Sequence, residues 1–243
     1  MRFFKNYILT FIFVIALQQT SFSQIKFWVG PAIGVSIPSG DYAGTTQDFY
    51  NGTGYGLNSG LTIGAILKAK FTALNLKVSV NYTSLSTSGN ALPSSGSISE
   101  KQNLFMIGIG PEFAFGPAVS QIKPYLGVNL LFTSFGGETT FQDVPRVPDG
   151  TYSTAATTRT GIGVDIGTEI GFAGKYALDI NFQYSFLNLL GKSFNGGDSR
   201  IFSYTSLNDA QDPLFAENIN THPIGSSRTI SLFQLNLAFL FGF

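Results

Sequence analysis

The sequence predicts an all-β fold, an eight-stranded antiparallel up-and-down transmembrane β-barrel. In eight segments, apolar residues recur at every second position, which is the period of a strand with one apolar face. Only 12% of the residues are charged, about half the share in a soluble domain, and the mean hydropathy is +0.19. Each segment also has roughly the 9–11 residues with which a tilted strand crosses a bilayer.

Residues 1–23 are predicted to be a signal peptide that is cleaved before Gln24. Two basic residues, Arg2 and Lys5, precede an apolar stretch, and small serines precede the cleavage position. A membrane anchor that stays attached is the alternative, but the apolar stretch is short for a spanning helix. We therefore expect an exported chain in which residues 24–243 form one barrel domain.

The predicted strands each place large apolar side chains on one face and small or polar side chains on the other. In residues 74–82, for example, Leu, Val and Tyr alternate with Asn, Lys and Ser. Two Gly-Pro pairs, at 30–31 and 110–111, fall inside strands and indicate bulges or bends, unless the strand boundaries there are wrong. In chain order the strands cover residues 25–37, 56–69, 72–82, 103–115, 124–132, 161–172, 176–186 and 232–243.

The links between the strands separate a membrane barrel from a soluble β-sandwich, which also alternates. Short and long links follow each other strictly, as in outer-membrane barrels with tight periplasmic turns and long external loops. An even number of strands returns both termini to the same side, which we expect to be the periplasm. The short links lie near 69–71, 116–123 and 173–175, and the long ones at 38–56, 84–101, 134–160 and 190–228.

Aromatic residues on the apolar face fall at the strand ends, where two interfacial girdles are expected. One group lies beside the short links and comprises Phe113, Phe115, Phe172, Tyr176, Phe241 and Phe243. The other lies beside the long links and comprises Tyr82, Phe105, Phe132, Tyr184 and Phe186.

The polar face carries charges in mid-strand that a sandwich core would hardly tolerate but that a barrel lumen can hold. We expect them to form one hydrogen-bonded network, because unpaired charge in a narrow lumen is costly. This network is either a structural plug or a path for protons or cations. The excess of acidic residues predicts that any current through the barrel prefers cations. The expected lumen network is Lys77, Glu112, Asp165, Glu169 and Asp179.

Two further sets of inward residues bear on whether the lumen is open. Ten inward glycines either leave an open lumen or make room for large inward side chains such as Trp28, Tyr125 and Gln183. Four inward apolar residues either line a small hydrophobic mouth or pack beneath the loops. These four are Leu104, Met106, Leu131 and Leu187.

The chain resembles small eight-stranded outer-membrane barrels of the OmpA, OmpX and OmpW kind. The resemblance rests on a leader that ends in FSQ and on the block GIGPEFAFGP…KPYLGVNL at 108–130, both typical of Bacteroidota barrels. It implies a Gram-negative outer membrane, periplasmic termini, and contact with outer-membrane lipids and lipopolysaccharide. The closing strand, with Phe239, Phe241 and Phe243, also resembles the signal that the barrel-assembly machinery recognises.

We expect a monomer with a structural or interaction role, such as an accessory subunit of a larger outer-membrane complex. The loops at 134–160 and 190–228 either bind a protein partner or form a folded lid. A narrow porin-like channel for small solutes is the alternative. The balanced charge, with no basic patch, argues against nucleic acid as a partner, and the absence of Cys excludes disulfides and Cys-based metal sites.

An enzyme that modifies lipids is a remote alternative. His222 is the single histidine, and the same long loop contains acids and serines that could complete a catalytic triad. A triad is defined by geometry rather than by proximity in sequence, and a loop histidine beside proline is usually a surface residue. We therefore expect neither enzymatic activity nor a cofactor. The residues in question are His222, Asp212, Glu217, Ser226 and Ser227.

Overall fold

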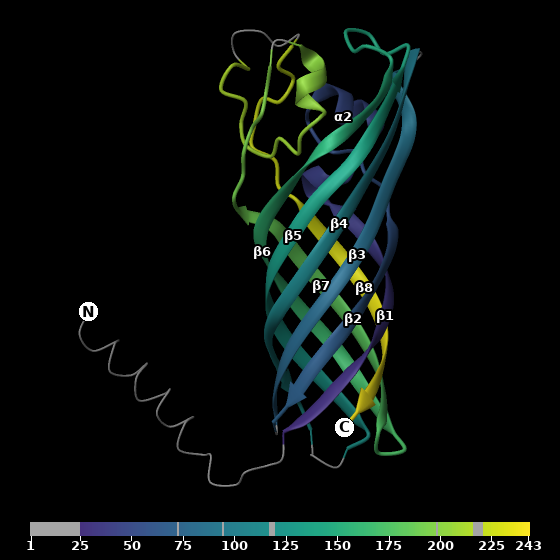
Figure 1. Cartoon of the computed structure of the whole chain (residues 1–243), viewed down its shortest axis with the longest axis vertical. Coiled ribbons are helices and arrows are strands. Elements are labelled where there is room, and N and C mark those ends of the chain that lie inside the picture. Colours follow the sequence, from purple (N-terminus) through teal and green to yellow (C-terminus); the bar gives the residue numbers. More distant parts are fainter. Residues whose placement is uncertain (1–24, 72, 94, 117–119, 198, 216–220) are drawn as a thin grey trace, which may run out of the picture.

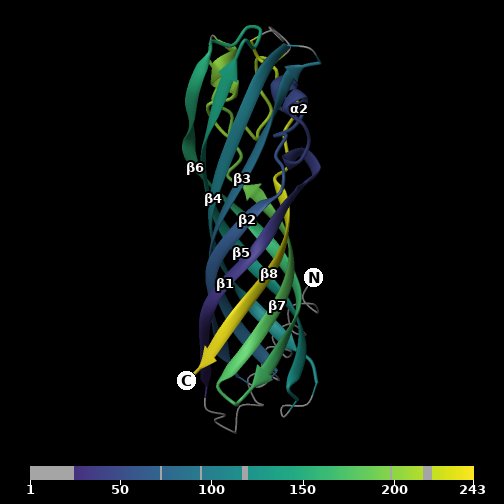
Figure 2. The ribbon, with the colours of Figure 1, turned by 90° about the vertical axis from the view of Figure 1, so that its right-hand side faces the viewer.

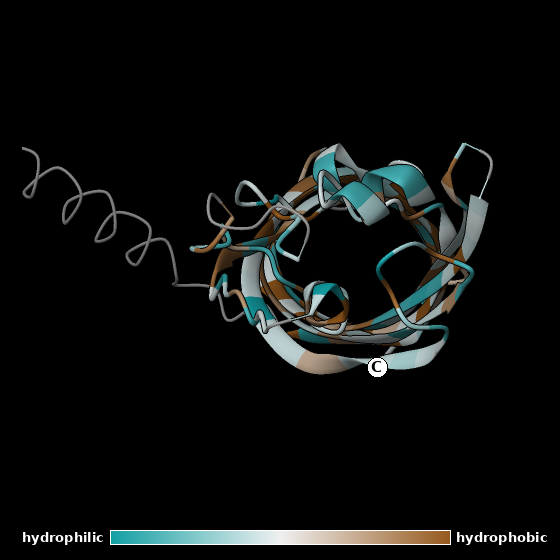
Figure 3. Cartoon of the chain, turned by 90° about the horizontal axis from the view of Figure 1, so that it is seen from above, coloured by the Kyte–Doolittle hydropathy of each residue, from teal (hydrophilic) through white to brown (hydrophobic). Residues whose placement is uncertain are grey.

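The chain closes into a barrel of eight antiparallel strands, in agreement with the predicted fold class (Figure 1, Figure 3). Each strand pairs with its neighbour in sequence, and β1 pairs with β8, so the ring has no open seam. The computed structural model describes residues 25–71, 73–93, 95–116, 120–197, 199–215 and 221–243, so the predicted signal peptide lies outside the described residues. The strands are β1 (Lys26–Ser39), β2 (Gly60–Lys70), β3 (Leu74–Leu92), β4 (Ser95–Ala114), β5 (Ile122–Gln142), β6 (Gly150–Phe172), β7 (Tyr176–Leu190) and β8 (Ser231–Gly242).

The two ends of the barrel differ in their connections. At one end, here called the turn end, the strands are joined by the three short links, and β1 begins beside the last residue of the chain, Phe243. The opposite end, here called the loop end, carries the two irregular links, 40–59 and 191–230 (Figure 1, Figure 2). No helix of the described chain is long and apolar enough to cross a membrane.

In the described part of the chain, the helical elements all belong to the loop end. The first link contains η1 (Gly40–Tyr42) and α2 (Thr46–Asn51), and the last link contains η2 (Arg200–Ser203). Helix α2 begins at a capping box, in which Thr45 and Asp48 each bond the other's backbone N–H, and it ends at Gly52 in the left-handed conformation. These local signals fix a short helix beside β3, the strand that it contacts.

The outward face of the barrel carries a band of exposed apolar side chains, as the alternation predicts. In β4 this band runs from Phe105 to Phe113, whereas the next outward residues toward the loop end are Asn103 and Lys101. The membrane-spanning part of β4 therefore ends near Phe105. The predicted girdle residues at the turn end are all exposed, while Tyr184 and Phe186 of the other girdle are half-buried because they pack against each other.

The prediction of long loops is wrong for two of the four long links. Most of 84–101 and 134–160 is strand, because β3 and β4 stay paired up to Leu92 and Ser95, and β5 and β6 up to Phe141 and Gly150. Beyond the membrane neither face has to be apolar, so the two-residue period fades although the ladder of hydrogen bonds continues. The opposite boundary error affects Leu57: the pattern of 56–69 predicts it on the outward face of a strand, but it lies buried in the link ahead of β2.

This extension of β3 to β6 has two free edges, and both are covered by the irregular links. The Thr46 hydroxyl of α2 donates to the Asn90 carbonyl on the β3 edge at 2.7 Å. On the β6 edge, the Ala155 N–H donates to the Thr205 carbonyl at 2.8 Å. Covering of exposed edges blunts edge-to-edge association, so the links protect the extension as well as the barrel mouth.

The two Gly-Pro pairs lie inside β1 and β4, so the strand boundaries there are right, but they are not bulges. The β1–β8 register is the same before and after Pro31, and the β4–β5 register is the same around Pro111. The β1–β8 and β4–β5 pairings are interrupted only at the glycine and the proline themselves, because proline has no backbone N–H to donate. The preceding glycine is required by close approach, because a Cβ on Gly30 would lie 1.8 Å from the Phe239 carbonyl oxygen.

Candidate functional site: a filled lumen and its cap

A layer of paired charges fills the lumen in its turn-end half. The Lys68 ammonium lies 2.9 Å from Glu112 and also contacts Asp179, and these three side chains are at most 1% exposed. Lys77 contacts Asp165 and lies 3.4 Å from the other oxygen of Glu112. Glu112 thus bridges two lysines, and the layer is a continuous network of opposite charges.

The structure places all five residues of the expected network in the lumen, but it adds two lysines that the sequence analysis left out. Lys68 is central to the layer, and Lys70 pairs with Glu169 closer to the turn end. The lumen therefore holds three lysines against four carboxylates rather than one against four. The acidic excess on which the expected cation preference rests is therefore one charge rather than three.

Neutral polar side chains complete this layer. The Tyr125 hydroxyl donates to Asp179 at 2.6 Å, and the Asn129 amide donates to Asp165 at 2.5 Å. Tyr125 reaches across the lumen because Gly167 leaves room for it, since a Cβ at Gly167 would lie 2.4 Å from the phenol ring. At this position the inward glycine accommodates a large side chain, which is one of the two alternatives that the sequence left open.

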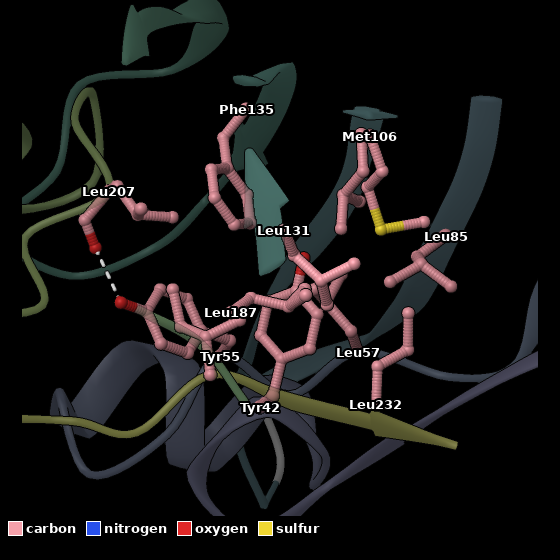
Figure 4. Close-up of a cluster of buried hydrophobic side chains, with 12 residues drawn as sticks. Tyr42, Tyr55, Leu57, Leu85, Met106, Leu131, Phe135, Leu187, Leu207 and Leu232 are labelled. Carbon is pink, nitrogen blue, oxygen red and sulfur yellow. Dashed lines mark hydrogen bonds between the residues drawn. The ribbon is translucent and has the colours of Figure 1, made fainter. Parts of the chain in front are cut away.

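A compact apolar cluster fills the lumen toward the loop end (Figure 4). It includes the four inward apolar residues singled out from the sequence, so these pack beneath the loops rather than line an open mouth. The irregular links supply five of its twelve residues, and the Tyr55 hydroxyl donates to the Leu207 carbonyl at 2.8 Å. The cluster comprises Tyr42, Tyr55, Leu57, Leu85, Leu104, Met106, Leu131, Phe135, Leu187, Leu207, Ile230 and Leu232.

Above this cluster, the two irregular links form a cap that is held by two buried arginines. Arg159 of β6 makes two hydrogen bonds to Asp209, of 2.9 and 2.8 Å. Burial raises the pKa of Asp209, but hydrogen bonds from Arg159, the Ser193 N–H and Asn188 outweigh it and lower that pKa below its usual range. Asp209 is therefore ionised at neutral pH and anchors link 191–230 to the barrel wall.

The second arginine, Arg228, joins the last link to the first. Its guanidinium donates to the carbonyls of Gly54, Leu207 and Asn208 and lies 4.0 Å from the centre of the Tyr55 ring. A planar guanidinium can donate in several directions and stack at the same time, so one side chain holds two backbone segments together. Both links consequently close over the lumen as one unit.

A second apolar cluster lies at the outer rim of the cap. It joins α2 and the last link to the 143–149 connection between β5 and β6, and the Tyr204 hydroxyl donates to the Tyr50 carbonyl at 2.6 Å. The loops at 134–160 and 190–228 thus contribute to a folded lid. The buried members of this cluster are Phe49, Tyr50, Ala91, Ile98, Phe141, Val144, Val147 and Tyr204.

Glu100 is a buried carboxyl between the lumen and the cap. It points inward from β4, above the exposed apolar band, and its side chain is 4% exposed. Burial raises the pKa of Glu100 to about 8, and the positive charge of Arg228 opposes that shift. The group is therefore largely protonated at neutral pH, and nothing in the sequence pattern distinguishes it from a solvated glutamate.

His222 belongs to the cap and pairs with an acid, as the triad hypothesis requires. Its Nδ1 lies 2.8 Å from Asp212, and both side chains are buried. The Ser227 hydroxyl, however, donates to the Asp209 carbonyl at 3.0 Å, and Glu217 lies outside the described residues. Within the described ranges, no group of three or more His, Cys, Asp or Glu side chains is arranged to hold a metal ion.

Comparison with known proteins identifies a family to which the sequence is similar. The family of the outer membrane protein beta-barrel domain matches residues 8–208, which is most of the chain. The chain belongs to this family. The protein is therefore an outer-membrane barrel, located in the outer membrane, with a filled lumen and a cap.

Solved structures of other outer-membrane barrels share the fold. Neisserial surface protein A is 15% identical, with a TM-score of 0.50, and the match covers 89% of this chain and 97% of that one. OprG from Pseudomonas aeruginosa is 10% identical, with a TM-score of 0.51, and the match covers 90% and 96%. No curated protein matches the sequence. At these identities the likeness concerns the fold alone.

Proposed function

We propose that this outer-membrane barrel does not conduct solutes and acts as a structural or interaction protein, an accessory subunit of a larger outer-membrane complex. The observation that carries the proposal is the twelve-residue apolar cluster, which occupies the lumen between the charged layer and the cap. An eight-stranded barrel is only wide enough for its own side chains, and a dry apolar plug is a barrier to ions and polar solutes.

The proposed partner surface is the outer face of the cap. Two large apolar side chains of the last link, Phe202 and Leu214, are 48% and 43% exposed, although the same link buries others beneath it. Affinity purification from native membranes tests the role, with Phe202→Ser/Leu214→Ser compared to the natural chain. Loss of a co-purified protein in this variant supports the proposal, and an unchanged set of partners contradicts it.

The alternative function is the narrow channel, and planar-bilayer recording separates it from the proposal. The purified protein is expected to give no steps above the background of the bilayer. Regular single-channel steps in a sample shown to be folded by circular dichroism contradict the closed barrel. The sequence-based prediction that any such current prefers cations is tested in the same recording.

We also propose that the termini and the turn end face the periplasm, and that the cap faces outward, near lipopolysaccharide. Short links at one end and a large folded assembly at the other support this orientation. The chain has no Cys, so single cysteines can report it. Intact cells should label Ser226→Cys but not Lys175→Cys with a membrane-impermeant maleimide, and the reverse pattern contradicts the orientation. The Bacteroidota resemblance of residues 108–130 stays a prediction.

The non-enzymatic character of the protein is likewise a proposal. Asp212 holds the His222 imidazole within the cap, and the Ser227 hydroxyl donates to the Asp209 carbonyl rather than to His222. Mass spectra of lipid A from cells with and without the protein are expected to be the same. A new lipid A species that disappears in His222→Ala would establish enzymatic activity instead.

A further inference from the structure

The turn end of the lumen opens into a cavity of about 390 Å³, here called the vestibule. Inward residues of several strands line it, among them Lys26, Trp28 and Lys70. Tyr125 also lines it and bonds Asp179 of the charged layer, so that layer lies directly behind the vestibule. A cavity of this size falls within the range of sites for small organic ligands, roughly 300–1,000 Å³.

The walls of the vestibule carry a positive charge excess. Lys26, Lys70 and Lys123 contribute three ammonium groups, and Glu169 contributes one carboxylate, which gives +2. That carboxylate is already paired with Lys70, and it also lies opposite Lys123 in the β5–β6 register. The charge layer behind the vestibule joins two lysines to three carboxylates and carries −1, so the positive excess of +2 belongs to the accessible mouth of the lumen.

Trp28 supplies a second and independent observation. Its side chain is only 9% exposed, yet its indole N–H has no hydrogen-bond partner among the described residues. Buried indole N–H groups normally find an acceptor. The Lys70 ammonium lies 4.0 Å from the centre of the Trp28 ring, so the unpartnered donor and a cation occur at the same wall.

The rim of the vestibule is aromatic. Phe71, Phe172 and Tyr176 line it and are also exposed on the outward face, where the turn-end girdle meets the lipid. Gly171 leaves the space between this rim and the lysines free, because a Cβ there would meet only the Gln121 carbonyl oxygen, at 3.7 Å. The vestibule thus combines cations with an apolar margin.

We propose that the vestibule binds an organic phosphate monoester, with its phosphoryl group among Lys26, Lys70 and Lys123 and its apolar part against the aromatic rim. A phosphate monoester carries about −1.5 to −2 charge at pH 7 and offers several acceptor oxygens, which matches the three ammonium groups of the +2 walls. The ester is either a soluble metabolite or the headgroup of a lipid from the adjoining leaflet. This inference is independent of the proposed interaction role, because it concerns the opposite end of the barrel.

The chain contains a single tryptophan, Trp28, so its fluorescence reports on the vestibule alone. The purified protein in neutral detergent micelles is titrated with hexyl phosphate, hexanol and inorganic phosphate. A saturable change is expected with hexyl phosphate, a weaker one with inorganic phosphate and none with hexanol. The absence of a saturable change, or an equal response to hexanol, overturns the proposal.

Two variants separate charge from volume. Lys26→Gln/Lys123→Gln removes two of the three ammonium groups and should weaken hexyl phosphate binding roughly tenfold. Gly171→Leu keeps every charge but fills the free space and should abolish the response. Lys175→Gln, at the same end but outside the cavity lining, is the matched control. Unchanged binding in both test variants, with folding verified by circular dichroism, contradicts the site.

Nanodiscs identify the source of the phosphate. The protein is placed in phosphatidylcholine nanodiscs with and without phosphatidic acid, whose headgroup is a phosphate monoester. If the lipid is the ligand, phosphatidic acid shifts Trp28 emission and prevents the response to hexyl phosphate. If the ligand is soluble, phosphatidic acid has no effect and hexyl phosphate still binds. In either case, the proposal predicts that Lys26→Gln/Lys123→Gln weakens the change in Trp28 emission that the ligand causes.

Discussion

The Arg159 guanidinium and the Asp209 carboxylate form a two-point pair that is almost completely buried, at 3% and 0% exposure. The two residues are 50 positions apart, one on the barrel wall and the other in the last irregular link. Asp209 also accepts hydrogen bonds from Asn188 and from the Ser193 N–H. The cap is therefore attached to the barrel by a charge pair with satisfied partners and not by apolar packing alone.

Asp209→Asn should loosen the cap without unfolding the barrel. Removal of one partner from a buried charge pair costs about 3–5 kcal/mol, because the other charge stays buried and unpaired. Protease cleavage within 191–230 should consequently become roughly a hundredfold to several thousandfold faster, since cleavage follows the population of the open cap. Asp143→Asn, at an exposed position of the loop end, is the control. Equal cleavage of both variants would refute the anchoring role.

Glu100→Gln should stabilise the protein at high pH and leave it unchanged in acid. The unfolded carboxyl ionises near its ordinary pKa of 4.5, while the folded one ionises only at about 8. Between these values the folded state binds the extra proton, so stability falls as pH rises from about 4.5 to about 8 and stays low above it. Urea unfolding in detergent at pH 4 and pH 9 measures the difference, with Glu138→Gln, exposed on β5, as control.

Neighbouring leucines of β5 should differ in their contribution to stability. Leu131 is buried in the lumen cluster, whereas Leu130 faces the lipid and is 43% exposed. Leu131→Ala should cost about 2–5 kcal/mol, because it leaves a cavity in a packed cluster. Leu130→Ala should cost less, since detergent or lipid fills the space. Similar losses in urea unfolding would show that the cluster is not tightly packed.

Lys68→Met should be among the most destabilising substitutions of the lumen. It leaves Glu112 and Asp179 without their shared lysine, and breaking such a pair costs about 3–5 kcal/mol. Lys175→Met removes a lysine from an exposed turn and should change the free energy of unfolding by less than about 1 kcal/mol. If the two variants unfold at the same urea concentration, the charged layer contributes no net stability.

Deletion of Phe243 should lower the amount of protein in the outer membrane more than deletion of a loop residue such as Ser226. The predicted assembly signal is Phe239, Phe241 and Phe243. The backbone of Phe243 also pairs with Phe27, and its ring is 76% exposed. Phe243→Ala keeps the backbone pairing and removes the ring, so a similar loss in this variant assigns the effect to recognition by the assembly machinery. Normal membrane levels of both variants, or poor refolding in detergent without any machinery, contradict that role.

The sequence predicted the part of the fold in which the bilayer imposes a pattern. The lipid requires apolar residues outward, so the eight spanning segments and their faces follow from a two-residue period. Beyond the membrane this requirement ends, and stretches such as 84–92, rich in Ser and other small polar residues, resemble a loop although they continue β3. The polar outward residues of the extension gave no signal of strand.

The lumen contacts could be predicted only in part. The inward face of each strand is readable, but which inward residues meet depends on the barrel's closure, since Lys68 of β2 contacts Asp179 of β7, far from it in strand order. The vestibule shows the same limit, because its lysines come from β1, β2 and β5. The lid was one of two alternatives, and the hydrogen bonds of Arg228 that distinguish it involve backbone carbonyls, which no sequence pattern reveals.

Arg228 lies three residues before β8 and donates to Gly54, in the link that precedes β2. β8 also forms the seam of the barrel with β1. If the first link is out of place, the Arg228 guanidinium loses the Gly54 carbonyl and keeps only Leu207 and Asn208 of its own link as acceptors. The residue that ties the two links together is therefore also joined, three residues along the chain, to the strand that closes the barrel.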